Sequence, residues 1–250
     1  MSVIIIKQTD VYYEVKGNRG KNVILLHGWG QNTKMMDYIA EFLKSHFIVY
    51  NLDFPGFGNS PEPKDSWSNE DYTEMLHEFV NELKIENPII IAHSFGSRVS
   101  LYYAYKYPVY KMVLTGAAGI KDKHNIEWYI KVYSYKLAKL LLKPFKGLSE
   151  KLRNKAGSSD YKNASAIMKD TLVKCVNFDI TPYLKDIKPE TLLVFGEKDE
   201  ATPLWMGKKL EKLMPNATLV TFENEDHFAY FREPDRFNRV LEAYLGADYE

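Results

Sequence analysis

Short apolar runs alternate with helix-like segments along most of this chain. Runs of strand length occur at 22–26, 47–52, 88–93, 111–116, 191–195 and 217–222. Apolar residues recur at helical spacing at 34–44, 69–84, 95–106, 204–214 and 232–246. Because alternating strands and helices bury their apolar surfaces best as a mostly parallel sheet covered on both faces, an α/β fold is predicted.

The N-terminal residues follow a different pattern. Two apolar stretches, 2–8 and 10–16, are too close for a crossover helix and are predicted to form an antiparallel hairpin. This hairpin brings the predicted sheet to eight strands. The active site of such a sheet forms where the parallel strands end. Five polar residues follow predicted strands, as that rule requires: His27, Asp53, Ser94, Asp199 and His227.

Ser94 lies where a predicted strand passes directly into a predicted helix. Small residues, Ala92 and Gly96, stand two positions on either side and allow the strand and helix to approach closely. A serine at such a turn is held in a strained backbone conformation, with its hydroxyl above the sheet. We therefore interpret Ser94 as a catalytic nucleophile.

A serine hydroxyl is a weak nucleophile at neutral pH and needs a base. His227 can take its proton and return it to a leaving group, because imidazole titrates near neutral pH. Asp199 can accept a hydrogen bond from the other ring nitrogen and so fix the tautomer. Asp226 adjoins His227 and is a poor partner, since adjacent side chains rarely face each other. His93 is interpreted as a packed histidine.

In these motifs the sequence resembles the α/β-hydrolase family. The matching segments are Leu-Leu-His-Gly-Trp-Gly at 25–30, the serine turn, and the pattern Gly-x-x-Asp-x-x-x-Pro at 196–203. The chain order Ser94, Asp199, His227 is that of the family's triad. The resemblance covers nearly the whole chain apart from about 118–184.

The resemblance also implies how an oxyanion would be bound. The backbone N–H groups of Trp29 and Phe95 are expected to form the oxyanion hole. His27 is expected to pin the Trp29 loop by hydrogen bonding. Asp53, with the glycines that follow it at 56 and 58, is expected to shape the floor of the site.

Over seventy residues separate the strands predicted at 111–116 and 191–195, which indicates an inserted helical cap. We place the hydrolase core at 1–117 and 185–250 and the cap at 118–184. Within the cap, 126–145 is predicted to be a helix that is apolar over more than half of its circumference. Trp128 and Tyr129 of this helix are expected to line an apolar substrate pocket with Trp29 and Phe95. The alternative is a helix that buries one face while lysine stems cover the other.

Composition narrows the classes of partner. Thirty-three basic residues balance thirty-three acidic ones, so the protein has no net positive charge that would attract nucleic acid. No apolar stretch is long enough to span a bilayer, and the N-terminal segment lacks the pattern of an export signal, so we expect a cytoplasmic protein. The lone Cys175 is interpreted as a small buried hydrophobe. No metal-ligand cluster or nucleotide motif occurs in the sequence, so neither a metal nor a cofactor is expected.

The sequence thus favours a serine hydrolase that cleaves an ester or related acyl bond of a small to medium apolar substrate through an acyl-enzyme. Three alternatives stay open. One is hydrolysis of a carbon–carbon bond in a vinylogous diketone, for which Arg98 or a cap lysine would bind the substrate carboxylate, although an internal ion pair explains Arg98 more simply. The others are a ligand sensor with a vestigial triad and a membrane-associated lipase. The oligomeric state is not determined by the sequence.

Overall fold

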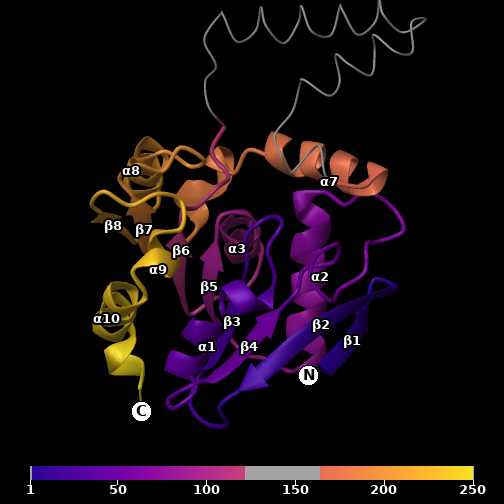
Figure 1. The fold of residues 1–250 in the computed structure, drawn as a ribbon, viewed down its shortest axis with the longest axis horizontal. Coiled ribbons are helices and arrows are strands. Elements are labelled where there is room, and N and C mark those ends of the chain that lie inside the picture. Colours follow the sequence, from indigo (N-terminus) through magenta and orange to yellow (C-terminus); the bar gives the residue numbers. More distant parts are fainter. Residues whose placement is uncertain (1, 122–163, 250) are drawn as a thin grey trace, which may run out of the picture.

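A single sheet organises the chain in the computed structural model, which describes residues 2–121 and 164–249. The strand order is β1-β2-β4-β3-β5-β6-β7-β8 (Figure 1). The strands are β1 Ser2–Ile6, β2 Thr9–Lys16, β3 Asn22–Leu26, β4 Ile48–Leu52, β5 Ile89–His93, β6 Lys111–Thr115, β7 Glu190–Gly196 and β8 Ala217–Phe222. Strand β2 pairs antiparallel with β1 and β4, and the other neighbours are parallel. The predicted hairpin and mostly parallel eight-stranded sheet are confirmed.

Each of the five predicted helices is present with ends within three residues of the prediction, whereas the helices at 166–177 and 229–232 were not predicted individually. The α-helices are α1 Asp37–Leu43, α2 Asn69–Glu82, α3 Phe95–Lys106, α7 Ala166–Asn177, α8 Leu204–Leu213, α9 Ala229–Arg232 and α10 Pro234–Leu245, and the 3₁₀ turns are η1 Thr33–Met35, η2 Thr181–Asp186 and η3 Gly246–Asp248. The segment predicted as one helix at 34–44 is divided, because Asn32 caps a separate 3₁₀ turn through the N–H of Lys34. Helix α10 begins at Pro234, which has no N–H to donate.

Helices cover both faces of the sheet, and strand side chains alternate between them. Ile24 and Leu26 of β3 pack into the core that α2, α3 and α8 complete, whereas Val23 and Leu25 pack against α1 and α10. A strand that is buried on both faces must be apolar at every position, which explains the uninterrupted apolar runs in the sequence.

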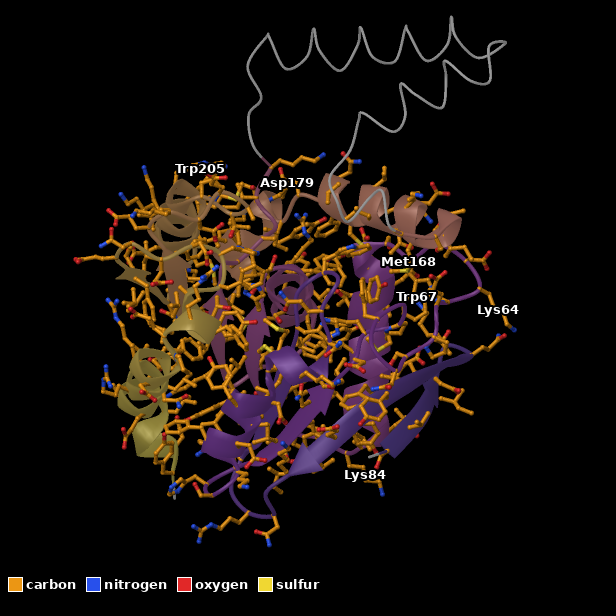
Figure 2. All side chains as sticks on the ribbon, in the orientation of Figure 1. Lys64, Trp67, Lys84, Met168, Asp179 and Trp205 are labelled. Atoms are coloured by element: carbon orange, nitrogen blue, oxygen red, sulfur yellow. The ribbon has the colours of Figure 1, made fainter. Side chains whose placement is uncertain are left out.

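The segment between β6 and β7 returns to the core over α2 (Figure 1). The N–H of Trp67 donates to Thr171 Oγ1 of α7 at 3.0 Å. Met168 of α7 and Trp67 lie between this helix and the core beneath it (Figure 2). The N–H of Ile180 donates to the carbonyl of Gly119 at 3.0 Å, which joins the two described ends of the segment.

Two predictions for this region have different outcomes. Cys175 is buried as expected, and its burial raises the pKa of the thiol to about 12. The helix predicted at 126–145, with Trp128 and Tyr129, lies outside the described residues. The cap boundaries at 118 and 184 stay a prediction.

Candidate active site

Ser94 forms a strained turn between β5 and α3. Its backbone has φ +49° and ψ −105°, a conformation that residues with a side chain rarely adopt and that costs roughly 1–3 kcal/mol. The surroundings hold it there, since the N–H of Ser94 donates to the carbonyl of Thr115 at 2.9 Å and its carbonyl accepts from the N–H groups of Arg98 and Ala118. The strained turn predicted at Ser94 is confirmed.

The small residues beside Ser94 are required by close packing. A Cβ on Gly96 would lie 2.4 Å from the carbonyl oxygen of Leu26 and 2.8 Å from that of His27. Both obstacles are backbone atoms at the end of β3, so they cannot move aside easily. Ala92 is fully buried on the other side of the turn. The start of α3 therefore rests directly on the end of the neighbouring strand.

Asp199 and His227 are joined by a hydrogen bond. His227 Nδ1 lies 2.7 Å from Asp199 Oδ2, and because an ionised carboxylate only accepts, the proton is on Nδ1. Asp199 Oδ1 also accepts from the N–H groups of Ala201 and Thr202, both at 2.8 Å, and Oδ2 accepts from Thr202 Oγ1 at 2.8 Å. The side chain of Asp199 is fully buried, whereas that of His227 is 15% exposed. The neighbouring Asp226 instead accepts from the N–H of Phe228 and from Arg232.

Ser94 follows β5, which is separated from β7 in the sheet by β6 alone. Its hydrogen-bond partner Thr115 precedes Gly116, and a Cβ on Gly116 would lie 2.9 Å from His227 Nδ1. The ring of His93, the residue before Ser94, has its centre 4.6 Å from that of His227. Within residues 2–121 and 164–249, the hydroxyl of Ser94 forms no hydrogen bond, with His227 or with any other group. The structure thus joins two of the three predicted residues and brings the third to the same edge.

His93 is the packed histidine that the sequence predicts. It is fully buried, and its Nδ1 lies 2.9 Å from Thr115 Oγ1. Its ring also packs against Tyr230, at 4.6 Å between ring centres. Burial, together with the nearby His227, holds the pKa of His93 well below its usual range. The ring is therefore neutral at physiological pH.

His27 pins the loop after β3. The N–H of Phe54 donates to His27 Nε2 at 3.0 Å, so the ring proton is on Nδ1, which donates to the carbonyl of Gly28 at 2.7 Å. Burial lowers the pKa of His27 to about 4, which keeps this tautomer neutral. A Cβ on Gly28 would meet the ring of His93 at 2.9 Å. The scaffold role predicted for His27 is confirmed.

The two residues predicted for the oxyanion hole lie next to each other. The rings of Trp29 and Phe95 pack edge to face with centres 5.3 Å apart. Within the described part of the chain, the backbone N–H of neither residue has a hydrogen-bond acceptor. Phe95 is the first residue of α3, where N–H groups have no partner inside the helix.

Asp53 supports the floor of this region. Its carboxylate accepts from the N–H of Thr33 at 2.6 Å and from that of Asn59 at 2.8 Å. Gly58 has φ +57°, and a Cβ there would lie 2.2 Å from Asp53 Oδ2. Because its oxygens are occupied by loop N–H groups, Asp53 has the structural role that the sequence predicts.

A cavity of about 340 Å³ lies beside Trp29. Its lining residues are Trp29, Gly30, Gly56, Phe57, Glu62, Ala164, Ser165 and Met168. Phe57 and Glu62 belong to the loop after β4, where the sequence motif marks only Asp53 and the two glycines. Met168 comes from α7, over a hundred positions away, and no local sequence signal connects it to this loop.

Arg98 corrects an expectation from the sequence. Instead of forming an internal ion pair, its guanidinium Nη1 donates to the carbonyl of Phe178 at 2.7 Å, and no carboxylate among the described residues pairs with it. Burial lowers its pKa to about 10, so it stays charged at neutral pH. The reason is packing: α3 lies against the segment that contains η2, which presents a carbonyl group there.

The described residues contain neither a metal-binding cluster nor a membrane-spanning helix. No group of three or more histidine, cysteine, aspartate or glutamate side chains is arranged to hold a metal ion in that part of the chain. Over the same residues, every helix is too short or too polar to cross a bilayer.

This sheet order, with a strained serine turn after β5 and a hydrogen-bonded Asp–His pair after β7 and β8, is the architecture of an α/β hydrolase. The chain belongs to the α/β-hydrolase family, whose sequence model matches residues 23–240.

Curated relatives are similar over most of their length. The AB hydrolase superfamily protein YisY of Bacillus subtilis (strain 168) is 27% identical, with 89% of this chain and 90% of the relative covered. A 2-hydroxy-6-oxo-6-phenylhexa-2,4-dienoate hydrolase of Comamonas testosteroni is 26% identical, with 94% and 91% covered. Among solved structures, an esterase from Exiguobacterium antarcticum has the same fold, with a TM-score of 0.77, 22% identity and coverage of 98% and 99%.

Proposed function

We propose that this protein is a serine hydrolase that cleaves an ester or related acyl bond of a small to medium apolar substrate. The observation that carries the proposal is the 2.7 Å hydrogen bond between Asp199 and His227 at the sheet edge where Ser94 forms its strained turn. A buried carboxylate that orients an imidazole is the arrangement that activates a serine hydroxyl.

The proposed reaction follows from these positions. Ser94 Oγ attacks the carbonyl carbon while His227 Nε2 takes the hydroxyl proton, and Asp199 stabilises the imidazolium that forms. The N–H groups of Trp29 and Phe95, which lack other acceptors among the described residues, donate to the developing oxyanion. His227 then protonates the leaving alcohol. In the second half of the reaction, water attacks the acyl carbon while His227 takes its proton, and His227 returns that proton to Ser94 Oγ as the acid leaves.

Apolar side chains near Ser94 support an apolar substrate. Trp29, Phe57 and Phe95 are in mutual ring contact, at 4.8 to 6.3 Å between centres. Trp128 and Tyr129 are proposed to extend this surface. No cofactor is required by the proposed chemistry, and a single cysteine is compatible with the cytoplasmic location that we propose.

The direct test is the variant Ser94→Ala. We expect hydrolysis of a short p-nitrophenyl ester to fall at least about a thousandfold, and labelling by a fluorophosphonate to disappear. Ser45→Ala, at an exposed serine, is the matched control and should leave both unchanged. Fluorophosphonate labelling of the Ser94→Ala protein to the same extent as the wild type would contradict the assignment of Ser94 as the nucleophile. Stoichiometric labelling of the wild type without turnover of any ester would instead indicate a ligand sensor.

A second candidate is hydrolysis of a carbon–carbon bond in a vinylogous diketone. The similarity to the Comamonas dienoate hydrolase favours it, and the same three residues would serve. Such a substrate carries a carboxylate that needs a cationic partner. Arg98, the described candidate, is buried and already donates to Phe178. Faster turnover of 2-hydroxy-6-oxo-6-phenylhexa-2,4-dienoate than of simple esters would reverse the ranking.

A further inference from the structure

The cavity beside Trp29 combines aromatic walls with one carboxylate. The rings of Trp29 and Phe57 meet edge to face at 4.8 Å, and the thioether of Met168 covers another side. Among residues 2–121 and 164–249, Glu62 is the one ionisable residue in the lining. The lining thus mixes polar and apolar groups, with two aromatic rings and an exposed carboxylate facing the same space.

The charge of Glu62 is not neutralised by its described neighbours. Its Oε2 accepts from Ser165 Oγ at 2.7 Å, while Oε1 has no partner among the described residues. Within the same residues, no lysine or arginine forms an ion pair with it. Lys64, two positions along the loop, reaches Gln8 at 3.5 Å and projects outward from the molecule (Figure 2).

These groups together select for positive charge. The faces of tryptophan and phenylalanine attract cations through their quadrupoles, and a nearby carboxylate adds a direct electrostatic attraction. The same carboxylate repels an anion. We propose that the cavity beside Trp29 binds a cationic group with an apolar body, such as an alkylammonium. The substrate would then be apolar around its acyl bond and carry an amine or quaternary ammonium at the end that this cavity holds.

This cavity adjoins the proposed catalytic residues without including Ser94. Trp29 forms its wall on one side and packs against Phe95, the residue after Ser94. A group held there would therefore lie away from the bond that is cleaved. As a statement about the substrate, the inference rests on the proposed function, whereas the binding of a cation does not.

A structural role for Glu62 must be separated from a binding role. Ser165 caps α7 by accepting from the N–H of Met168 at 3.1 Å, so Glu62 also ties the loop after β4 to this helix. The variant Glu62→Gln keeps a carbonyl oxygen that accepts from Ser165 Oγ and removes only the charge. Asp65→Asn, at an exposed carboxylate on the same loop, removes a charge outside the cavity and is the matched control.

The binding experiment compares three probes of nearly identical shape by chemical-shift titration of the Ser94→Ala protein. These probes are choline, the neutral 3,3-dimethylbutan-1-ol and the anionic 3,3-dimethylbutanoate. We expect choline to bind most tightly and the anion least tightly. Glu62→Gln should weaken choline about two- to fivefold and leave the neutral alcohol unchanged, and Asp65→Asn should have no effect. Phe57→Leu should weaken choline more than the neutral alcohol.

Several outcomes would overturn the proposal: binding of the anion as tightly as choline, an unchanged preference in Glu62→Gln, or no binding of choline. In a parallel assay, acetylthiocholine should be hydrolysed with a higher kcat/KM than its neutral 3,3-dimethylbutyl analogue by the wild-type enzyme. If neither ester is turned over while choline still binds through Glu62, then the proposed function fails and the cation site stands.

Discussion

Gly116 lies directly against the ring of His227. A Cβ on Gly116 would come 2.9 Å from His227 Nδ1 and 3.3 Å from Asp199 Oδ2, and the glycine has φ +49°. The backbone at the end of β6 therefore borders the hydrogen bond that orients the imidazole. Any side chain at this position would press on both members of the pair.

For this reason, Gly116→Ala should reduce kcat/KM for a p-nitrophenyl ester by about ten- to a hundredfold, because small displacements of catalytic groups have large effects on rate. Gly246→Ala is the control, since a Cβ at Gly246 meets nothing within 4 Å. The alanine variant at 116 should still fold, as judged by circular dichroism. Wild-type activity in the Gly116→Ala protein would show that the pair tolerates displacement or is not catalytic.

Thr202 provides a second constraint on the same pair. Its hydroxyl lies 2.8 Å from Asp199 Oδ2 and 3.2 Å from His227 Nδ1. Thr202→Val removes the hydroxyl at constant shape, and we expect kcat to fall about two- to tenfold with little change in KM, as for the loss of one hydrogen bond. Thr202→Ser should restore most of kcat. Equal kcat in the valine and serine variants would exclude a positioning role for the hydroxyl.

The strain at Ser94 should be measurable as stability. Its positive φ and its ψ of −105° suit glycine better than any residue with a Cβ. Ser94→Gly should therefore unfold at higher denaturant concentration than Ser94→Ala, by about 1 kcal/mol in the free energy of unfolding, while both are inactive. Urea titrations of the two variants give the comparison. An alanine variant as stable as the glycine variant would mean that the turn is not strained.

Buried neutral histidines should make stability depend on pH. The folded-state pKa of His27 is about 4, against an ordinary value of 6.5. Between these values the unfolded chain binds the proton and the folded protein does not, so the free energy of unfolding falls as the pH falls through this window. The full loss of unfolding free energy that the lowered pKa of His27 causes across this window is on the order of 3 kcal/mol. Burial of His93 adds a dependence of the same sign.

The measurement is urea unfolding at several pH values between about 5 and 6.5, above the range where carboxylates dominate. His27→Gln should show a shallower loss of stability on acidification than the wild type. A slope that is the same in the wild type and in His27→Gln would contradict the assignment of a buried neutral ring.

Much of the fold was predictable because its signals are local. Uninterrupted apolar runs mark strands that are buried on both faces, and the passage from the β5 run into a helix marks the turn at Ser94. Asp199 could be preferred over Asp226 as the partner of His227 because adjacent side chains face different directions. In the structure, Asp199 and not Asp226 forms the hydrogen bond with His227. The strands, the serine turn and the rejection of Asp226 need only neighbouring residues along the chain, whereas Asp199 was assigned from the pattern at 196–203 that resembles the family's.

Contacts between distant segments could not be predicted in the same way. Gly116 against His227, Thr202 between Asp199 and His227, and Met168 beside Trp29 all depend on how loops from separate strand ends and α7 pack together. Arg98 illustrates the difference, because its position in α3 was foreseeable, whereas its acceptor, the carbonyl of Phe178, was not. Periodicity and turn chemistry act over a few residues, while the identity of a neighbour eighty positions away is decided by close packing of the completed layers.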